Sequence, residues 1–290
     1  MSHAQAVKLA LRGGDDLAQM IGALGTAEHP RGAVLNAYRQ AERNLTLAMQ
    51  PESLTARQFG VRQALVDLRD TMRQAAQTAL LAAVAAGSTL AMQQADAYAL
   101  PTPPAVVVIE PLLAAWLAAV DAQIGAANAL VALDAAPVEV LGDDTRAGVL
   151  RPAVVVAEGS RWLATALAAA AAAAWAASLR QAGQIEEQWY HQAVAAIDER
   201  TTDCCLRVNG QVQKLTDPFI LTGTPRFADK KQAPPFHWCC RTSEALLPAR
   251  EAGDELTQQM REAGAAELAA RGPDGKNRVE IHPAHARSRR

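Results

Sequence analysis

The chain has 290 residues, enough to bury a substantial core in one large domain or two ordinary ones. Half of the residues are hydrophobic, but alanine supplies much of that share and aromatic residues make up only 4%. This composition favours closely packed helices over a sheet-rich core. A net charge of −2 argues against a protein whose whole surface binds nucleic acid.

The N-terminal segment MSHAQAVKLALRGGDD lacks the basic start, the continuous apolar core and the small-residue cleavage site of a secretion signal. We therefore expect the chain to occupy a reducing cytosol. In that environment metal binding or simple burial of cysteine is favoured over disulfide formation.

The first part of the chain, residues 1–183, is predicted to be helical, with breaks near 100–111 and 134–153 where proline and turn residues gather. A first helical pattern stops at Pro51. Thr55, with Gln58 three residues later, has the spacing of a capping box and predicts the start of a long helix.

Apolar residues recur at helical spacing along that long helix and predict one buried face; they are Val61, Leu65, Leu68 and Met72. Two more helices are expected, at about 112–133 and about 154–183.

The segment from Trp162 to Leu179 is uncharged and just reaches the length of a membrane span. Its apolar character comes mainly from the alanine run 168–174, and alanine contributes little to membrane insertion. We therefore expect a helix packed inside the protein and no membrane span.

Beyond residue 183 the composition changes. The stretch QIEEQWYHQAVAAIDER is predicted to continue as helix, with Trp189, Val194 and Ile197 on one face. Good N-cap residues precede the first cysteines, so a short helix is expected to begin near Asp203 and to end at Asn209-Gly210, in preference to a hairpin there. The runs QVQKL and PFILTG have the composition of short strands.

These patterns together predict a mainly α protein. Long alanine-rich helices over residues 1–183 are followed by a small α+β module, rich in cysteine and histidine, at 184–250. Residues 251–290 are expected to form a helix and a flexible basic tail.

The only four cysteines form two adjacent pairs, Cys204-Cys205 and Cys239-Cys240, and His237 precedes the second pair. Zinc takes four thiolate and imidazole ligands. Cys205, His237 and Cys240 would supply three of them, and Cys204 or Cys239 the fourth.

Adjacent cysteines rarely both face one ion, so buried thiols packed beside a structural histidine explain the pattern equally well. A third explanation of the cysteine and histidine pattern is a nucleophilic Cys-His pair, which needs a lowered thiol pKa. A fourth is a disulfide formed after release into an oxidising environment.

Two sequence blocks, AIDERTTDCCLRVNGQV and PPFHWCCRTS, resemble the C-terminal signature of the tailed-phage minor head proteins, the Mu F-like head morphogenesis family, over about residues 189–247. Some members carry an additional cysteine where this chain has Thr202, and Cys239 falls at a position that is usually variable. The matching residues are Asp198, Arg200, Thr201, Cys205, Gly210, Gln211, Val212, Pro234, Pro235, His237, Cys240, Arg241 and Thr242.

The resemblance implies a structural virion protein and not an enzyme. Such a protein resides in the head interior or at the portal vertex, and in the host cytoplasm during assembly. It contacts the portal protein and other head components, acts in head morphogenesis, and influences genome packaging or ejection. The cofactor that its Cys/His cluster would hold is zinc.

The signature also has a physical reading. Asp198 and Arg200 are expected to hydrogen-bond the backbone of the crossing loop, and Arg241 to pair with a carboxylate there, as a structural lock. Two other functions stay open. One is a Cys-His hydrolase or toxin-like effector, and the other is a DNA-binding module in which the terminal arginines contact genomic DNA weakly.

Overall fold

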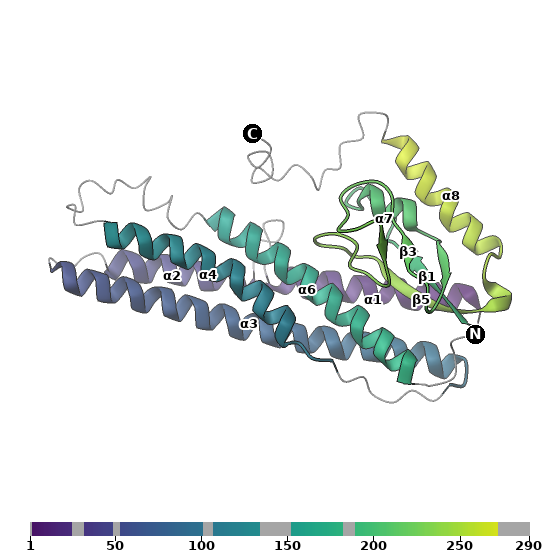
Figure 1. Cartoon of the computed structure of the whole chain (residues 1–290), viewed down its shortest axis with the longest axis horizontal. Coiled ribbons are helices and arrows are strands. Elements are labelled where there is room, and N and C mark those ends of the chain that lie inside the picture. Colours follow the sequence, from purple (N-terminus) through teal and green to yellow (C-terminus); the bar gives the residue numbers. More distant parts are fainter. Residues whose placement is uncertain are drawn as a thin grey trace. The chain divides into compact units, whose positions relative to one another are not determined.

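The protein is described from a computed structural model, which defines residues 2–24, 32–48, 53–100, 107–133, 152–181 and 189–271 (Figure 1). The predicted tail at 272–290 and most of the predicted loop at 134–153 lie outside the described residues. The chain divides into two compact units. Unit 1 comprises Met1–Gln19, Leu81–Val108 and Leu167–Arg290, and unit 2 comprises Met20–Leu80 and Ile109–Ala166.

The first part of the chain is helical, as predicted. Every helix expected there is present, and a further one precedes them at the N-terminus. The five helices described in this part are α1 (His3–Leu24), α2 (Ala33–Ala48), α3 (Leu54–Ala97), α4 (Glu110–Leu133) and α6 (Pro152–Gln181).

The start of α3 differs from the prediction by two residues. The helix begins at Leu54, and the hydroxyl of Ser53 accepts a hydrogen bond from the backbone N–H of Ala56 at 3.4 Å. The predicted cap at Thr55 is therefore wrong. Serine and threonine are both good N-cap residues, so the local sequence did not decide between positions 53 and 55.

Within unit 2, α3 buries the apolar face that its spacing predicted: Val61, Leu65, Leu68 and Met72 are all inaccessible to solvent. At the margin of this face Arg69 donates two hydrogen bonds to the carboxylate of Asp121 on α4, at 2.5 and 3.0 Å. Both side chains are partly exposed, so this bidentate pair orients the two helices more than it stabilises them.

The small α+β part lies in unit 1. Its three-stranded antiparallel sheet has the order β2-β1-β5, and two short strands form a second antiparallel pair. Figure 1 shows α7, α8 and the strands in green and yellow. The elements are β1 (Trp189–Val194), α7 (Asp203–Val208), β2 (Val212–Lys214), β3 (Phe219–Ile220), β4 (Lys230–Lys231), β5 (Ser243–Pro248), the 3-10 helix η2 (Ala249–Glu251) and α8 (Glu255–Ala270).

The helix predicted through WYHQAV is wrong, because residues 189–194 form β1, the central strand of the sheet. Tryptophan, tyrosine and valine all favour strands. A central strand is buried on both faces and therefore lacks the polar alternation that marks an exposed strand. The short helix near Asp203 and the strands in QVQKL and PFILTG are confirmed as α7, β2 and β3.

Helices cover both faces of this sheet. On one face, Val194, Ala245 and Leu247 pack against α1, and α8 adds Leu256 and Met260. On the other face, Leu246 packs against residues from the C-terminal halves of α3 and α6, namely Leu90, Ala91, Trp175 and Leu179. α1 and α8, which lie far apart in the sequence, therefore cover the same face of the sheet.

The outer edge of β5 is covered by side chains of α3. The backbone N–H of Leu246 donates to Gln94 Oε1 at 2.7 Å, and Gln94 Nε2 donates to the carbonyl of Glu244 at 3.2 Å. The hydroxyl of Tyr98 donates to the carbonyl of Leu246 at 3.2 Å. These bonds occupy backbone groups that an edge strand otherwise offers to another chain.

Two described helical segments, Gln58–Ala97 and Arg161–Leu179, are long and apolar enough to cross a membrane by length and composition. Both also contribute to the protein core, for example through Leu80, Leu167 and Trp175. Burial of the alanine-rich helix is what its sequence predicted, and the absence of a membrane span stays a prediction.

Candidate metal centre and its supporting network

The predicted cysteine and histidine ligands come together in unit 1. Cys204 and Cys205 lie on α7, while His237 and Cys240 come from the loop between β4 and β5, and all four are buried. Cys205 Sγ lies 3.0 Å from His237 Nε2 and 3.7 Å from Cys240 Sγ. The donor atoms of Cys204, Cys205 and His237 all lie within 4.8 Å of one another.

The orientation of His237 suits a metal ligand. Its Nδ1 hydrogen-bonds the backbone carbonyl of Trp238, and a carbonyl can only accept, so Nδ1 carries the proton. Nε2 is then an unprotonated acceptor that faces Cys205. Metal-ligating histidines are commonly held in this way, with the second ring nitrogen donating to a carbonyl.

Thr202 also belongs to this cluster. It occupies the N-cap position of α7 but makes no side-chain capping bond there. Its hydroxyl instead donates to His237 Nε2 at 2.8 Å and lies 3.7 Å from Cys204 Sγ. Some Mu F-like proteins carry a further cysteine at this position. In this chain the Thr202 side chain there contacts His237.

The donor set fits zinc. Tetrahedral zinc with ordinary zinc–thiolate bonds holds two sulfurs about 3.8 Å apart, and Cys205 and Cys240 are separated by 3.7 Å, whereas the 3.0 Å between Cys205 Sγ and His237 Nε2 is the length of a direct hydrogen bond. A disulfide needs about 2.05 Å between its sulfurs, and none of the four cysteines forms one. Three thiols and one imidazole match a common structural zinc site.

The protonation of these thiols bears on their chemistry. Burial raises the pKa of Cys205 and of Cys240 to about 12 each. Such groups are thiols near neutral pH and poor nucleophiles, whereas a bound metal ion stabilises the thiolate. The electrostatics thus favour a ligand role over a nucleophilic one.

Cys239 stands apart from this arrangement. Its backbone is left-handed, with φ of 58°, and its side chain is half-buried. Neither Cys239 nor Cys240 belongs to the compact donor group formed by Cys204, Cys205 and His237, and Cys240 adjoins that group through Cys205.

Asp198 and Arg241 join the two sequence blocks. The Arg241 guanidinium donates to both oxygens of the Asp198 carboxylate, at 2.7 and 2.9 Å. The same carboxylate accepts from the Arg200 backbone N–H and from the Thr201 hydroxyl, each at 2.9 Å. Burial, the largest single influence, raises the pKa of Asp198, but these donors together leave it lowered.

The remaining signature residues shape the backbone around the cluster. Gly210 follows α7 with φ of +74°, and a Cβ there would lie 2.9 Å from the carbonyl oxygen of Thr257 on α8. Its N–H donates to the carbonyl of Ala193 on β1 at 2.9 Å. Pro234 and Pro235 are buried and joined by a cis peptide bond.

Sequence reasoning missed Arg271, at the end of α8. It donates to the backbone carbonyls of Thr201 and Asp198, at 2.7 and 3.0 Å. A single arginine after an alanine-rich helix gives no local sign of such a role, because the partner carbonyls lie about seventy residues earlier in the chain.

His191 is buried on β1. Its Nδ1 lies 3.2 Å from Glu244 Oε1 on β5, and its Nε2 donates to the carbonyl of Asp217 at 3.0 Å. The aromatic ring of Phe219 packs against it, with ring centroids 4.2 Å apart. This buried pair ties the sheet to the loop that leads into β3.

Comparison with known proteins identifies one family. Residues 145–245 match the sequence model described as Phage Mu protein F like protein. The match begins well before the two cysteine blocks and includes all of α6, so it extends beyond the region of the sequence resemblance. No curated protein and no solved structure matches the chain.

Proposed function

Because residues 145–245 form a Phage Mu protein F-like domain, we propose that this chain is a structural minor head protein of a tailed phage or prophage. Membership of a phage head morphogenesis family indicates a location in the virion. Within the virion we place it in the head interior or at the portal vertex, in contact with the portal protein and other head components.

The family match is the observation that carries this proposal, and the geometry of the site supports it. The Cys/His cluster is buried and joins α7 to the loop before β5, and an ion pair joins Asp198, in the loop before α7, to Arg241 in the loop before β5. Both arrangements fasten chain segments together. A role in genome packaging or ejection follows from the proposed location at the vertex.

The hydrolase alternative is disfavoured by the same cluster. A cysteine hydrolase needs a thiolate that its substrate can reach. Cys205 and Cys240 are buried, and their pKa values are raised to about 12 by that burial. The DNA-binding alternative concerns the terminal arginines, which lie outside the described residues; its mark would be binding that weakens steeply with salt.

The head proposal is tested by peptide mass spectrometry on density-purified particles, with quantitation against the major capsid protein. We expect recovery at a low, fixed number of copies in procapsids and mature heads. Release of the protein together with portal oligomers when heads are disrupted would support the vertex location. Absence from both kinds of particle would overturn the proposal.

We further propose that a zinc ion holds α7 and the loop before β5 together, with Cys204, Cys205, His237 and Cys240 as its ligands. When bound, zinc stabilises the thiolate form and holds α7 against the loop before β5. The protein positions the donors: α7 presents both adjacent thiols, and the Trp238 carbonyl fixes the tautomer of His237.

Metal analysis of the purified protein tests this proposal. We expect about one zinc ion per chain, lost on substitution of Cys205→Ser or Cys240→Ser. Cys239→Ser is the matched control and should keep its zinc, because Cys239 is not one of the four proposed ligands. A protein that contains no zinc, and whose melting temperature is unchanged by a chelator, would leave the thiols as simple core residues.

A further inference from the structure

The outward side of α3 in unit 2 carries large apolar side chains in contact with solvent. Phe59 is 71% exposed and Val66 is 50% exposed. They are seven residues apart, close to two helical turns, so both lie on the same side of the helix. The opposite side of α3, which includes Val61 and Leu65, is buried in the core. The outward side is therefore a second apolar face, separate from the core contact.

Charged residues stand between and beside these apolar ones. Arg62, Asp70 and Arg73 are exposed as well. Together with Phe59 and Val66 they recur at steps of three, four, four and three residues, the spacing that keeps side chains on one side of an α-helix. We call this set the outer stripe of α3; its five residues are Phe59, Arg62, Val66, Asp70 and Arg73.

The charged groups of the outer stripe have no partner inside the chain, although their neighbours do. Arg69 bonds Asp121 on α4, and Asp67 accepts a hydrogen bond from Gln63 at 2.8 Å. Asp70 acts on Arg69 only at longer range. Within the part of the chain that the structure describes, the three charged side chains of the stripe form no ion pair and no hydrogen bond. They are therefore available to a second molecule.

The order of side chains along the outer stripe is symmetric about Val66. Arg62 and Asp70 each lie four residues from it, and Phe59 and Arg73 each lie seven residues from it. An antiparallel second copy centred on Val66 would place Arg62 of each chain opposite Asp70 of the other. It would also place Phe59 of each chain opposite Arg73 of the other. Every side chain of the stripe would then face a group of complementary chemistry.

The contacts in this arrangement are favourable in kind. Opposite charges meet across the two helices, a guanidinium lies over an aromatic ring, and the two central valines cover apolar surface. A parallel pair in the same register is disfavoured, because arginine would face arginine and aspartate would face aspartate. A small contact between exposed residues predicts a weak dimer with a micromolar dissociation constant that rises with salt.

We propose that the outer stripe of α3 binds a second copy of this chain, in an antiparallel two-fold dimer centred on Val66. Such an interface uses the same surface on both chains, and the two-fold axis closes it at two copies. This association needs only the purified protein. It can therefore be present or absent whatever the location of the chain in a phage head.

Sedimentation velocity on the full chain, at about 1–100 µM, tests for the dimer. We expect the sedimentation coefficient to rise with concentration from that of a monomer to that of a dimer. It should fall again as added salt screens the ion pairs. A chain that stays monomeric over this concentration range would overturn the proposal and leave the outer stripe to a different protein.

Charge reversal at two positions tests the antiparallel register. Arg62→Asp and Asp70→Arg each bring like charges together, so each variant alone should dimerise at least about tenfold more weakly than the wild type. An equimolar mixture of the two variants restores both pairs of opposite charge and should associate. The double variant, with both substitutions in one chain, should dimerise as the wild type does. Single variants that dimerise normally, or a mixture that stays monomeric, would contradict the proposed register.

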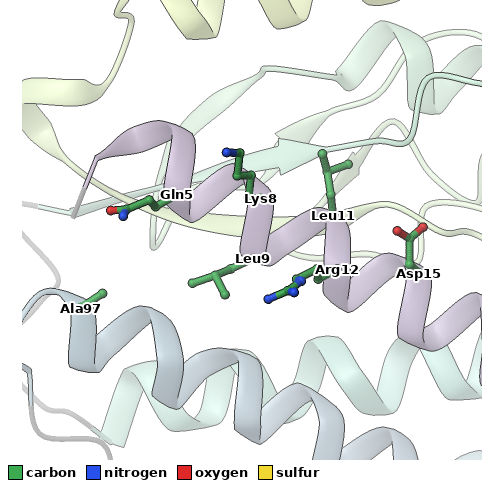
Figure 2. Close-up of a pocket in the computed structure, with 7 residues that line it drawn as sticks. All are labelled: Gln5, Lys8, Leu9, Leu11, Arg12, Asp15 and Ala97. Carbon is green, nitrogen blue, oxygen red and sulfur yellow. The ribbon is translucent and has the colours of Figure 1, made fainter.

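Matched substitutions elsewhere distinguish the outer stripe from general surface association. Asp67→Arg reverses a charge about a quarter turn away on the same helix and should leave dimerisation unchanged. Phe59→Ser should weaken the dimer, whereas Leu11→Ser should not. Leu11 is also exposed, but it lies on α1 and lines a groove in unit 1, as Figure 2 shows. If both serine variants weakened the dimer equally, the outer stripe would not be its interface.

Discussion

Asp198 pairs with Arg241 and so connects the two signature blocks. Because the pair needs an ionised carboxylate, the stability that it contributes depends on pH. The pKa of Asp198 is lowered by the bonds from Arg241, Thr201 and the Arg200 N–H, which outweigh the opposing effect of burial. A carboxyl group whose folded-state pKa is lowered contributes stability above its unfolded pKa. That contribution is lost as the pH falls through the lowered value.

Replacement of Asp198 by asparagine should therefore destabilise the protein at neutral pH and not in acid. The side chain is 40% exposed, so we expect a loss of only about 1 kcal/mol in the free energy of unfolding at pH 7. The difference from wild type should shrink as the pH falls below the ordinary pKa of aspartate, and vanish in acid once the lowered pKa of Asp198 has been passed. Urea unfolding at neutral and at acid pH measures it.

Asp229→Asn is the matched control for this substitution. Asp229 is paired with Arg226 but is 80% exposed, so its replacement should change stability little. If the two substitutions lowered the free energy of unfolding equally, the bonds of Asp198 would not be what holds the two signature blocks together.

Thr202 offers a second prediction at the same scale. Because its hydroxyl already reaches His237 Nε2, a thiol at this position should enter the proposed metal site. Thr202→Cys should raise zinc affinity at least about tenfold, because its thiolate can replace that of Cys204, which directly precedes Cys205 and is poorly placed to share one four-coordinate ion with it. Competition with a chromophoric chelator measures the affinity.

Thr202→Ser, which retains the hydroxyl, serves as the reference and should bind zinc as wild type does. If Thr202→Cys gains no affinity over this reference, the position does not face the metal.

Among the elements, the crossing of α3 and α6 explains the alanine run. A Cβ added at Gly87 would lie 2.2 Å from the carbonyl oxygen of Ala171, so the two helix backbones are in direct contact there. Ala168, Ala170 and Ala174 on α6 are buried. Small side chains permit this approach, and the run is therefore a packing feature of unit 1.

Gly87→Ala should destabilise the protein by about 2 kcal/mol or more, because one of two helix backbones must move to admit the methyl group. At Gly125 on α4, none of the described atoms beyond its own stretch of helix lies within 4 Å of the equivalent position. Gly125→Ala should therefore stabilise by about 0.5–1 kcal/mol, through helix propensity alone. Thermal unfolding of both variants checks the pair, and a Gly87→Ala protein as stable as wild type would contradict the packing argument.

The elements also show where sequence reasoning succeeds. Helices α2, α3, α4 and α6 follow from local apolar spacing and breaks, and α7 follows from its N-cap residues and Asn209-Gly210. β1 did not follow, because Trp189, Val194 and Ile197 imitate a helical face when the strand partners are unknown. The hydrogen-bond partners of His3, Gln94 and Arg271 could not be predicted from the local sequence, because they lie 70 to 251 residues away along the chain.

The candidate site was more predictable than its surroundings. Its ligand types stand in two compact blocks, so the residues could be named from the sequence. Their mutual distances, the tautomer of His237 and the diversion of Thr202 from its capping role depend on the folded backbone, and no local pattern encodes them.

At the scale of the whole molecule, the family match at residues 145–245 covers only part of the compact unit that contains the signature residues. The match ends at residue 245, inside β5, and omits α1 and α8. Yet α1 and α8 cover one entire face of the sheet. The compact unit is therefore assembled around the family domain from segments outside it.

A fragment limited to residues 145–245 should therefore fail to unfold cooperatively, since it lacks part of β5 and leaves Val194 and Ala245 uncovered. A chain ending at Arg271 retains every described contact and should unfold as the full chain does. Circular dichroism across a urea gradient distinguishes the two. Cooperative unfolding of the short fragment would show that α1 and α8 are dispensable.

A hydrogen bond between His3 and Asp254 joins residues 251 positions apart, and this has a consequence for synthesis on the ribosome. α1 precedes β5 and α8 along the chain, so its docking face is incomplete until both have been translated. The unit that carries the signature can close only after α8 has been made. Contacts of such sequence separation form slowly, so the newly made chain passes through an interval in which the apolar side of α1 and the sheet face that it covers are both exposed, which favours aggregation.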